Sequence, residues 1–204
     1  MKRIVLCAAA FAALALATSV HAAGTRNDDD SSRTSATTSE RALHDALESA
    51  LSRPAPAQVP ADAVRTLDFE RDAAVSARER EAFAAHLAKQ PNGGGPVVQA
   101  VRSGKLMDEF DRLLQRYGYS PRNLGDVLGA YLVICWEIVS ESDSNDEPAG
   151  QRAVRRQLAG PLASVPAIAR MSDAQKQGQA ERTAYLTMVA ASAYQELKIG
   201  RAHV

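Results

Sequence analysis

The stretch Asn123 to Glu141, NLGDVLGAYLVICWEIVSE, constrains the fold more than any other, because it is the longest mainly apolar run outside the extreme N-terminus. At ~100° per residue its large side chains cover an arc of roughly 200° around a helix. The arc consists of Leu124, Val127, Leu128, Tyr131, Leu132, Ile134, Cys135, Ile138 and Val139, with Trp136 at its edge. A helix that is apolar over so much of its circumference must be packed among other helices.

The same run is too short to cross a membrane. Its uninterrupted apolar part, Val127 to Trp136, is about ten residues long, whereas a bilayer span needs ~20. Asp126 and Glu137, which flank that part, would lie in the hydrocarbon. The run therefore predicts the central helix of a soluble domain.

The first 22 residues are typical of a secretory signal peptide. Lys2 and Arg3 precede the uncharged stretch 4–17, and Val20-His21-Ala22 offers a small-residue cleavage site. We expect a mature chain that begins near Ala23 and is periplasmic or secreted, without a membrane span after cleavage. An uncleaved N-terminal anchor is the alternative, but the apolar stretch is shorter than a span.

Cleavage would leave Cys135 as the single cysteine, which excludes an intramolecular disulfide. A zinc site needs three or four ligands, and away from the termini the chain offers only Cys135, His44 and His86 besides carboxylates. We therefore expect no metal, and no motif indicates a cofactor. The glycines at 93–95 lack the Gly-Lys-Ser/Thr that a phosphate-binding loop requires.

Charge and composition narrow the fold class and the partners. The formal net charge is zero, and loss of Lys2 and Arg3 leaves the mature chain about two units acidic, so the basic footprint of a nucleic-acid-binding protein is absent. Aromatic residues make up 5% of the chain and alanine is abundant, which favours packed helices over sheet.

Capping and spacing signals predict an all-α domain of roughly five to seven helices over residues 63–198. Helices are expected at 76–90, 96–102, 106–117, 123–139, from 148 onward with a kink near Pro161, and at 172–197. Only residues 66–69 hint at a strand, and they are too few to start a sheet. Short loops favour antiparallel packing of neighbouring helices.

Two terminal regions are expected to lie outside this domain. Residues 24–39 lack large apolar side chains and predict a disordered leader, which extends to residue 62 through an isolated amphipathic helix at 40–52 and a proline-rich linker. The last six residues, 199–204, match the translation of a common sequencing adapter. We therefore expect the natural sequence to end, within this chain, near residues 196–198.

Asp126 and Glu137 suggest the paired carboxylates of a hydrolase. Eleven residues place them on nearly the same side of a helix but roughly 16 Å apart along its axis, whereas hydrolytic pairs work at ~5 to 9.5 Å. We interpret Asp126 as a contact at the helix N-terminus and Glu137 as solvated. The stripe formed by Asp126, Ala130, Val133, Glu137 and Glu141 is then the part of the helix free to meet a partner.

Cys135 and Trp136 each allow two interpretations. Cys135 would be a nucleophile if His86 reached it, but its place in the apolar arc favours a core residue. Trp136 is more typical of a packing anchor than of a ligand platform, although its place at the edge of the arc leaves its indole N–H able to reach a polar group.

One resemblance follows from these residues. Tyr117-Gly118-Tyr119, Asn123, Asp126, Tyr131, Trp136 and Glu137 resemble the core of a family of small exported bacterial proteins of unknown function, over about residues 67–197. The resemblance implies an all-α exported domain and brings no catalytic residues.

We expect a non-enzymatic binding or interaction module for an unknown protein or envelope component. Its candidate binding residues are Asp126, Tyr131, Trp136 and Glu137. One alternative is a hydrolase of an envelope polymer with Asp126 or Glu137 as a single acid. Another is a secreted effector or inhibitor that docks on another protein through the stripe between Asp126 and Glu137.

Overall fold

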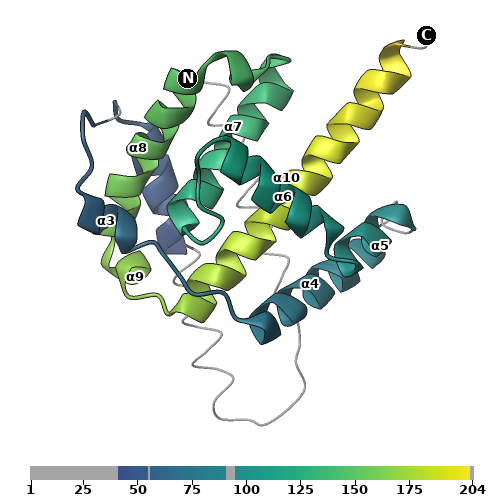
Figure 1. Cartoon of the computed structure of the whole chain (residues 1–204), viewed down its shortest axis with the longest axis horizontal. Coiled ribbons are helices and arrows are strands. Elements are labelled where there is room, and N and C mark those ends of the chain that lie inside the picture. Colours follow the sequence, from purple (N-terminus) through teal and green to yellow (C-terminus); the bar gives the residue numbers. More distant parts are fainter. Residues whose placement is uncertain (1–40, 55, 91–94, 203–204) are drawn as a thin grey trace.

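The computed structural model describes residues 41–54, 56–90 and 95–202. These residues form nine α-helices and one 3₁₀ turn and contain no named β-strand, which confirms the all-α class (Figure 1). The number exceeds the expected five to seven partly because α3 and α9 are single turns. The expected signal peptide, residues 1–22, and residues 23–40 of the expected leader lie outside the described residues.

The elements follow one another with short connections. A first helix covers residues 41–51 and is followed by α3 (Ala61–Arg65), α4 (Ala73–Ala88), α5 (Pro96–Arg102), α6 (Lys105–Arg116), α7 (Leu124–Ser140), the 3₁₀ turn η1 (Ser144–Asp146), α8 (Pro148–Ser164), α9 (Pro166–Ala169) and α10 (Asp173–Ala202). Helix α8 contains Pro161 without ending there, and α10 continues past the expected end at 197.

Helix α7 lies at the centre of the fold, as its sequence predicts. Every residue from Leu124 to Ile134 is buried, and α7 packs mainly against α8 and α10. Phe110 of α6 and Leu158 of α8 belong to the same hydrophobic cluster. The apolar arc is thus covered along the first two thirds of the helix, whereas Cys135 to Ser140 are half-buried or exposed.

The helix at 41–51 belongs to this core, although its sequence suggested an isolated helix ahead of a domain that begins at 63. Leu43, Ala46, Leu47 and Ala50 are buried in the cluster that contains the α7 side chains. The Gln157 Nε2 group of α8 donates to the carbonyls of Ala50 (3.0 Å) and Arg53 (2.8 Å). Leucines four residues apart revealed the apolar face but not the surface that covers it.

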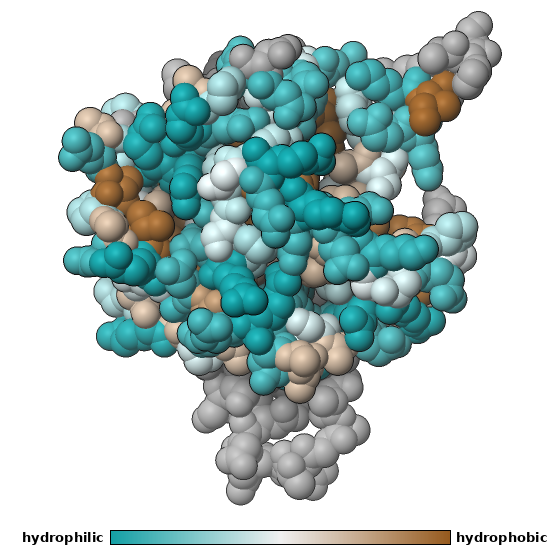
Figure 2. All heavy atoms as spheres, in the orientation of Figure 1, coloured by the Kyte–Doolittle hydropathy of each residue, from teal (hydrophilic) through white to brown (hydrophobic). Residues whose placement is uncertain are grey.

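Helices α4 and α5 form a second cluster with α10. The rings of Phe83 and Tyr185 stack with centroids 5.3 Å apart and join α4 to the middle of α10. Beyond this contact α10 projects past the other helices (Figure 1). Figure 2 shows hydrophobic residues near that projecting end, where Leu197 and Ile199 are 63% and 59% exposed.

No helix within the described ranges combines the length and the apolar character needed to span a bilayer.

Candidate functional site

The start of α7 is fixed by the short segment that hinted at a strand. Asp68 and Asn123 form an isolated antiparallel bridge. The Asn123 side chain caps α7 by accepting from the Asp126 N–H (3.0 Å), and its Nδ2 donates to the Val64 carbonyl (3.0 Å) and to Asp68 Oδ1 (2.6 Å). Asn123 is thus the N-cap of α7, and its side chain also ties α7 to residues more than fifty positions earlier.

Asp126 lies inside the protein and not on a solvent-facing stripe. It is 1% exposed, and its carboxylate accepts from Arg155 Nε (2.6 Å), Arg155 Nη2 (2.8 Å) and the Ser120 N–H (2.8 Å). Burial raises the pKa of the Asp126 carboxyl, and the hydrogen bonds from Ser120 and Arg155 oppose that rise. The carboxylate is held by donors of the protein itself.

Arg155 and Tyr119 complete this buried network. The guanidinium carbon of Arg155 lies 5.7 Å from the centroid of the Tyr119 ring, and the Tyr119 hydroxyl donates to the Gln151 carbonyl at 2.6 Å. Burial raises the pKa of Tyr119 to about 12. The network joins the loop before α7 to α8, and this is why α8 covers the side of α7 that the sequence left open.

The middle of the expected stripe is buried as well, whereas Glu141 at its end is exposed. Ala130 and Val133 are buried, so the stripe is not the exposed contact surface that the sequence suggested. Glu137 is half-buried and not fully solvated, because its Oε1 accepts from the Ser144 N–H at 2.9 Å. Tyr131 is also buried. Of the four candidate binding residues, Trp136 is the one that borders a cavity.

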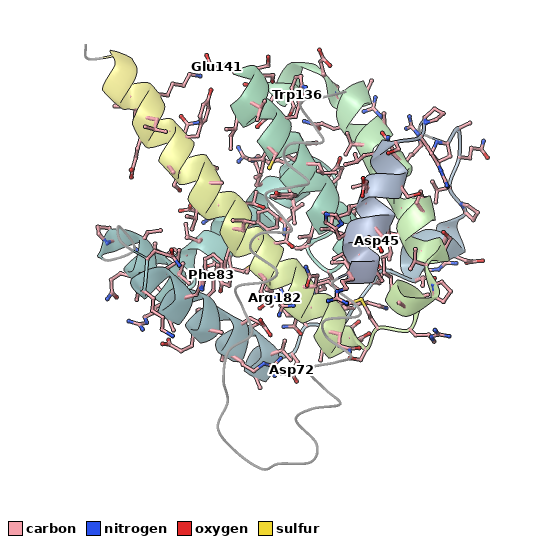
Figure 3. The ribbon with its side chains drawn as sticks, turned by 180° about the vertical axis from the view of Figure 1, so that it is seen from behind. Asp45, Asp72, Phe83, Trp136, Glu141 and Arg182 are labelled. Atoms are coloured by element: carbon pink, nitrogen blue, oxygen red, sulfur yellow. The ribbon has the colours of Figure 1, made fainter. Side chains whose placement is uncertain are left out.

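That cavity has a volume of about 510 Å³ and lies where three segments meet. One wall comes from residues 51–54, a second from the later part of α7, and a third from η1 and α8. Its apolar lining consists of Leu51, Pro54, Leu132, Val133, Trp136 and Val154. Figure 3 shows Trp136 and Glu141 toward the same end of α7, at which the acidic loop begins.

The polar lining was not foreseen from the sequence. It consists of Ser52, Arg53, Ser144, Glu147, Gln151 and Gln157 together with the backbone of Gly150. These residues come from segments about a hundred positions apart, and none belongs to a catalytic or metal-binding motif. The proline-rich segment and the acidic loop were visible as composition, but no local pattern shows that they meet.

The comparison with family models identifies the chain. The model of a family of unknown function, DUF6683, matches residues 4–201. This protein belongs to DUF6683. No curated protein and no solved structure matched it. The expectation that it belongs to a family of unknown function is confirmed, and the matched range is wider than the expected 67–197.

Metal ligands and thiols are the remaining groups of the DUF6683 chain that could carry chemistry. Among the described residues, no group of three or more His, Cys, Asp or Glu side chains could hold a metal ion. Cys135 is half-buried and packs against the main core, whereas His86, its suggested partner, lies on α4 with its Nε2 3.2 Å from Gln90 Nε2. These positions favour the interpretation of Cys135 as a packing residue.

Proposed function

We propose that this protein is an exported, non-enzymatic binding module whose ligand site is the cavity beside Trp136. The observation that carries the proposal is the cavity itself. Its volume of about 510 Å³ falls in the range of small-molecule sites, ~300 to 1,000 Å³. Such sites are mainly apolar with a few polar groups that orient the ligand, and this lining has that composition.

The positions of the two candidate acids support binding over hydrolysis. A general acid must come within hydrogen-bond reach of the bond that it cleaves. Asp126 is buried and held by Arg155, and Glu137 is engaged by the Ser144 N–H and does not line the cavity. The burial of Ala130 and Val133 likewise removes the surface on which docking through the α7 stripe depended.

Export rests on the sequence of residues 1–22. Mass spectrometry of protein from the periplasm and the medium is expected to show a chain that begins within a residue or two of Ala23. Recovery of intact Met1 on a membrane-bound product would contradict export without bearing on the cavity.

Ligand binding can be followed directly, because Trp136 is the one tryptophan in the chain. We expect decyl maltoside, titrated below its micelle concentration, to change the Trp136 fluorescence in a saturable way. A Val154→Phe variant fills part of the cavity and is expected to weaken this binding. Val139→Phe is the matched control, since Val139 lies on α7 outside the lining and is exposed.

Two results would count against the cavity as a ligand site. One is a fluorescence change that never saturates. The other is equal binding by the Val154→Phe and Val139→Phe variants, with circular dichroism showing that both are folded.

A further inference from the structure

The two glutamine side chains of the cavity use both donors of their amide groups and keep their oxygens as acceptors. Gln151 is 7% exposed, and its Nε2 donates to both the carbonyl and the hydroxyl of Ser144 at 3.0 Å. The Gln157 Nε2 donates to the carbonyls of Ala50 and Arg53. Within the described ranges, neither amide oxygen accepts a hydrogen bond. Each amide therefore offers its oxygen, the negative end of its dipole, and this favours a positively charged ligand group.

A carboxylate stands at the edge of the same lining. Glu147 is exposed, its side chain does not cap α8, and it forms no ion pair with another described residue. It closes the segment 141–147, ESDSNDE, which contains four acidic residues and no basic one. The carboxylate charges at this side of the cavity therefore attract a cation.

Arg53 carries a positive charge in the same lining, opposite in sign to that of Glu147. It lies on the first wall, is exposed, and pairs neither with Glu147 nor with another described carboxylate. A positively charged ligand group must therefore lie toward Glu147 and away from Arg53. The same lining contains Trp136, Leu132 and Val133, which offer an apolar surface and an aromatic ring suited to a cation.

We infer that the cavity takes a small cationic amphiphile, with its apolar body against Trp136, Leu132 and Val133 and an ammonium head beside Glu147 and the acceptor oxygens of Gln151 and Gln157. This inference rests on the proposed binding function and specifies its ligand class. The volume of about 510 Å³ is that of a small-molecule site, so the ligand class is a small molecule and not a polypeptide.

The test compares three probes that share a ten-carbon chain and differ in the head group. Decyltrimethylammonium, decyl maltoside and decyl sulfate are titrated into the full mature chain below their micelle concentrations, with Trp136 fluorescence as the readout. We expect the cationic probe to bind about three- to tenfold more tightly than the neutral one, and the anionic probe to bind most weakly. Added salt should reduce this preference.

Three charge variants test where in the cavity the cationic head group binds. Glu147→Gln is expected to lower affinity for decyltrimethylammonium about threefold and to leave decyl maltoside unchanged. Arg53→Gln should leave or raise affinity for the cation. Glu196→Gln makes the same charge change on the projecting part of α10 and should alter neither probe.

The outcomes separate this inference from the proposed function. If none of the probes binds saturably, the binding function itself fails. If decyl maltoside or decyl sulfate binds as tightly as decyltrimethylammonium, the site stands as a ligand site but the cationic class is wrong. Equal effects of Glu147→Gln and Glu196→Gln would place the cation elsewhere and would also overturn the inference.

Discussion

The two ends of α7 differ more than their sequences do. From Leu124 to Ile134 every residue is buried, and even the charged Asp126 is enclosed by Arg155 and the loop before the helix. From Cys135 onward the same apolar pattern continues, yet the side chains are half-buried or exposed and Trp136 borders a cavity. An apolar run therefore shows which face of a helix packs against the core. How far along the helix that face is buried depends on the neighbouring segments.

Two leucines on the first helix test this contrast most strongly. Leu47 is buried in the core, whereas Leu51, one turn later, is partly buried and lines the cavity. Leu47→Ala is expected to lower the free energy of unfolding by about 3 kcal/mol and Leu51→Ala by about 1 kcal/mol, because only the first creates a closed void. Urea denaturation measures both. Equal losses would show that the two ends are packed alike.

Substitution of the buried Asp126 is expected to give the next largest loss of unfolding free energy. Asp126→Ala removes the acceptor of the Ser120 N–H and of Arg155 and is expected to cost about 2 kcal/mol. The cost stays below that of a fully buried pair because the Arg155 side chain is 38% exposed and can be hydrated. A double-mutant cycle with Arg155→Met isolates the pair. A coupling energy near zero would contradict its place in the network.

Trp136 should matter more for binding than for stability. A fully buried tryptophan costs roughly 3 to 5 kcal/mol on truncation to alanine, but this side chain is half-buried, so we expect about 1 kcal/mol for Trp136→Ala. The variant has no tryptophan, and calorimetry with decyl maltoside replaces the fluorescence readout. A stability loss as large as that of Leu47→Ala would show that α7 is packed as tightly around Trp136 as it is at its N-terminal end.

Substitutions of Glu137 are expected to change the unfolding free energy least. Glu137→Gln retains an oxygen that accepts from the Ser144 N–H, so the unfolding free energy should change by less than about 0.5 kcal/mol. Glu137→Ala leaves that N–H without its acceptor and should cost about 1 kcal/mol. A larger loss for the glutamine variant would show that the charge itself holds the loop 141–147.

Local sequence patterns predicted much of the fold and little of the candidate functional site. Asn123, the N-cap of α7, and Gly118, which has a φ of 71° two residues after the end of α6, occupy positions that are decided by their immediate neighbours. The pairing of Asp126 with Arg155 links residues twenty-nine positions apart. Their separation follows from the path of α8 across α7, and no pattern within either helix specifies it.

The cavity also could not be predicted from local sequence patterns. Its first wall was assigned to a linker because Pro54 and its neighbours have the composition of one. What places that wall is the Gln157 side chain, which binds the carbonyls of Ala50 and Arg53 from more than a hundred residues away. Trp136 could be singled out at the edge of the apolar arc, but the space beside it depends on contacts that are formed only in the folded chain.

The order of the helices along the chain also determines when α7 is protected during synthesis. Its main covering helices, α8 and α10, both follow it, so they leave the ribosome after it does. Until α8 has emerged, the most apolar segment of the nascent protein has the helix at 41–51, Leu67, Phe69 and α6 to pack against, and α10 follows later still. The fold is thus completed from its C-terminal side, and the interval before α10 appears is when the chain is most exposed to aggregation and depends most on chaperones.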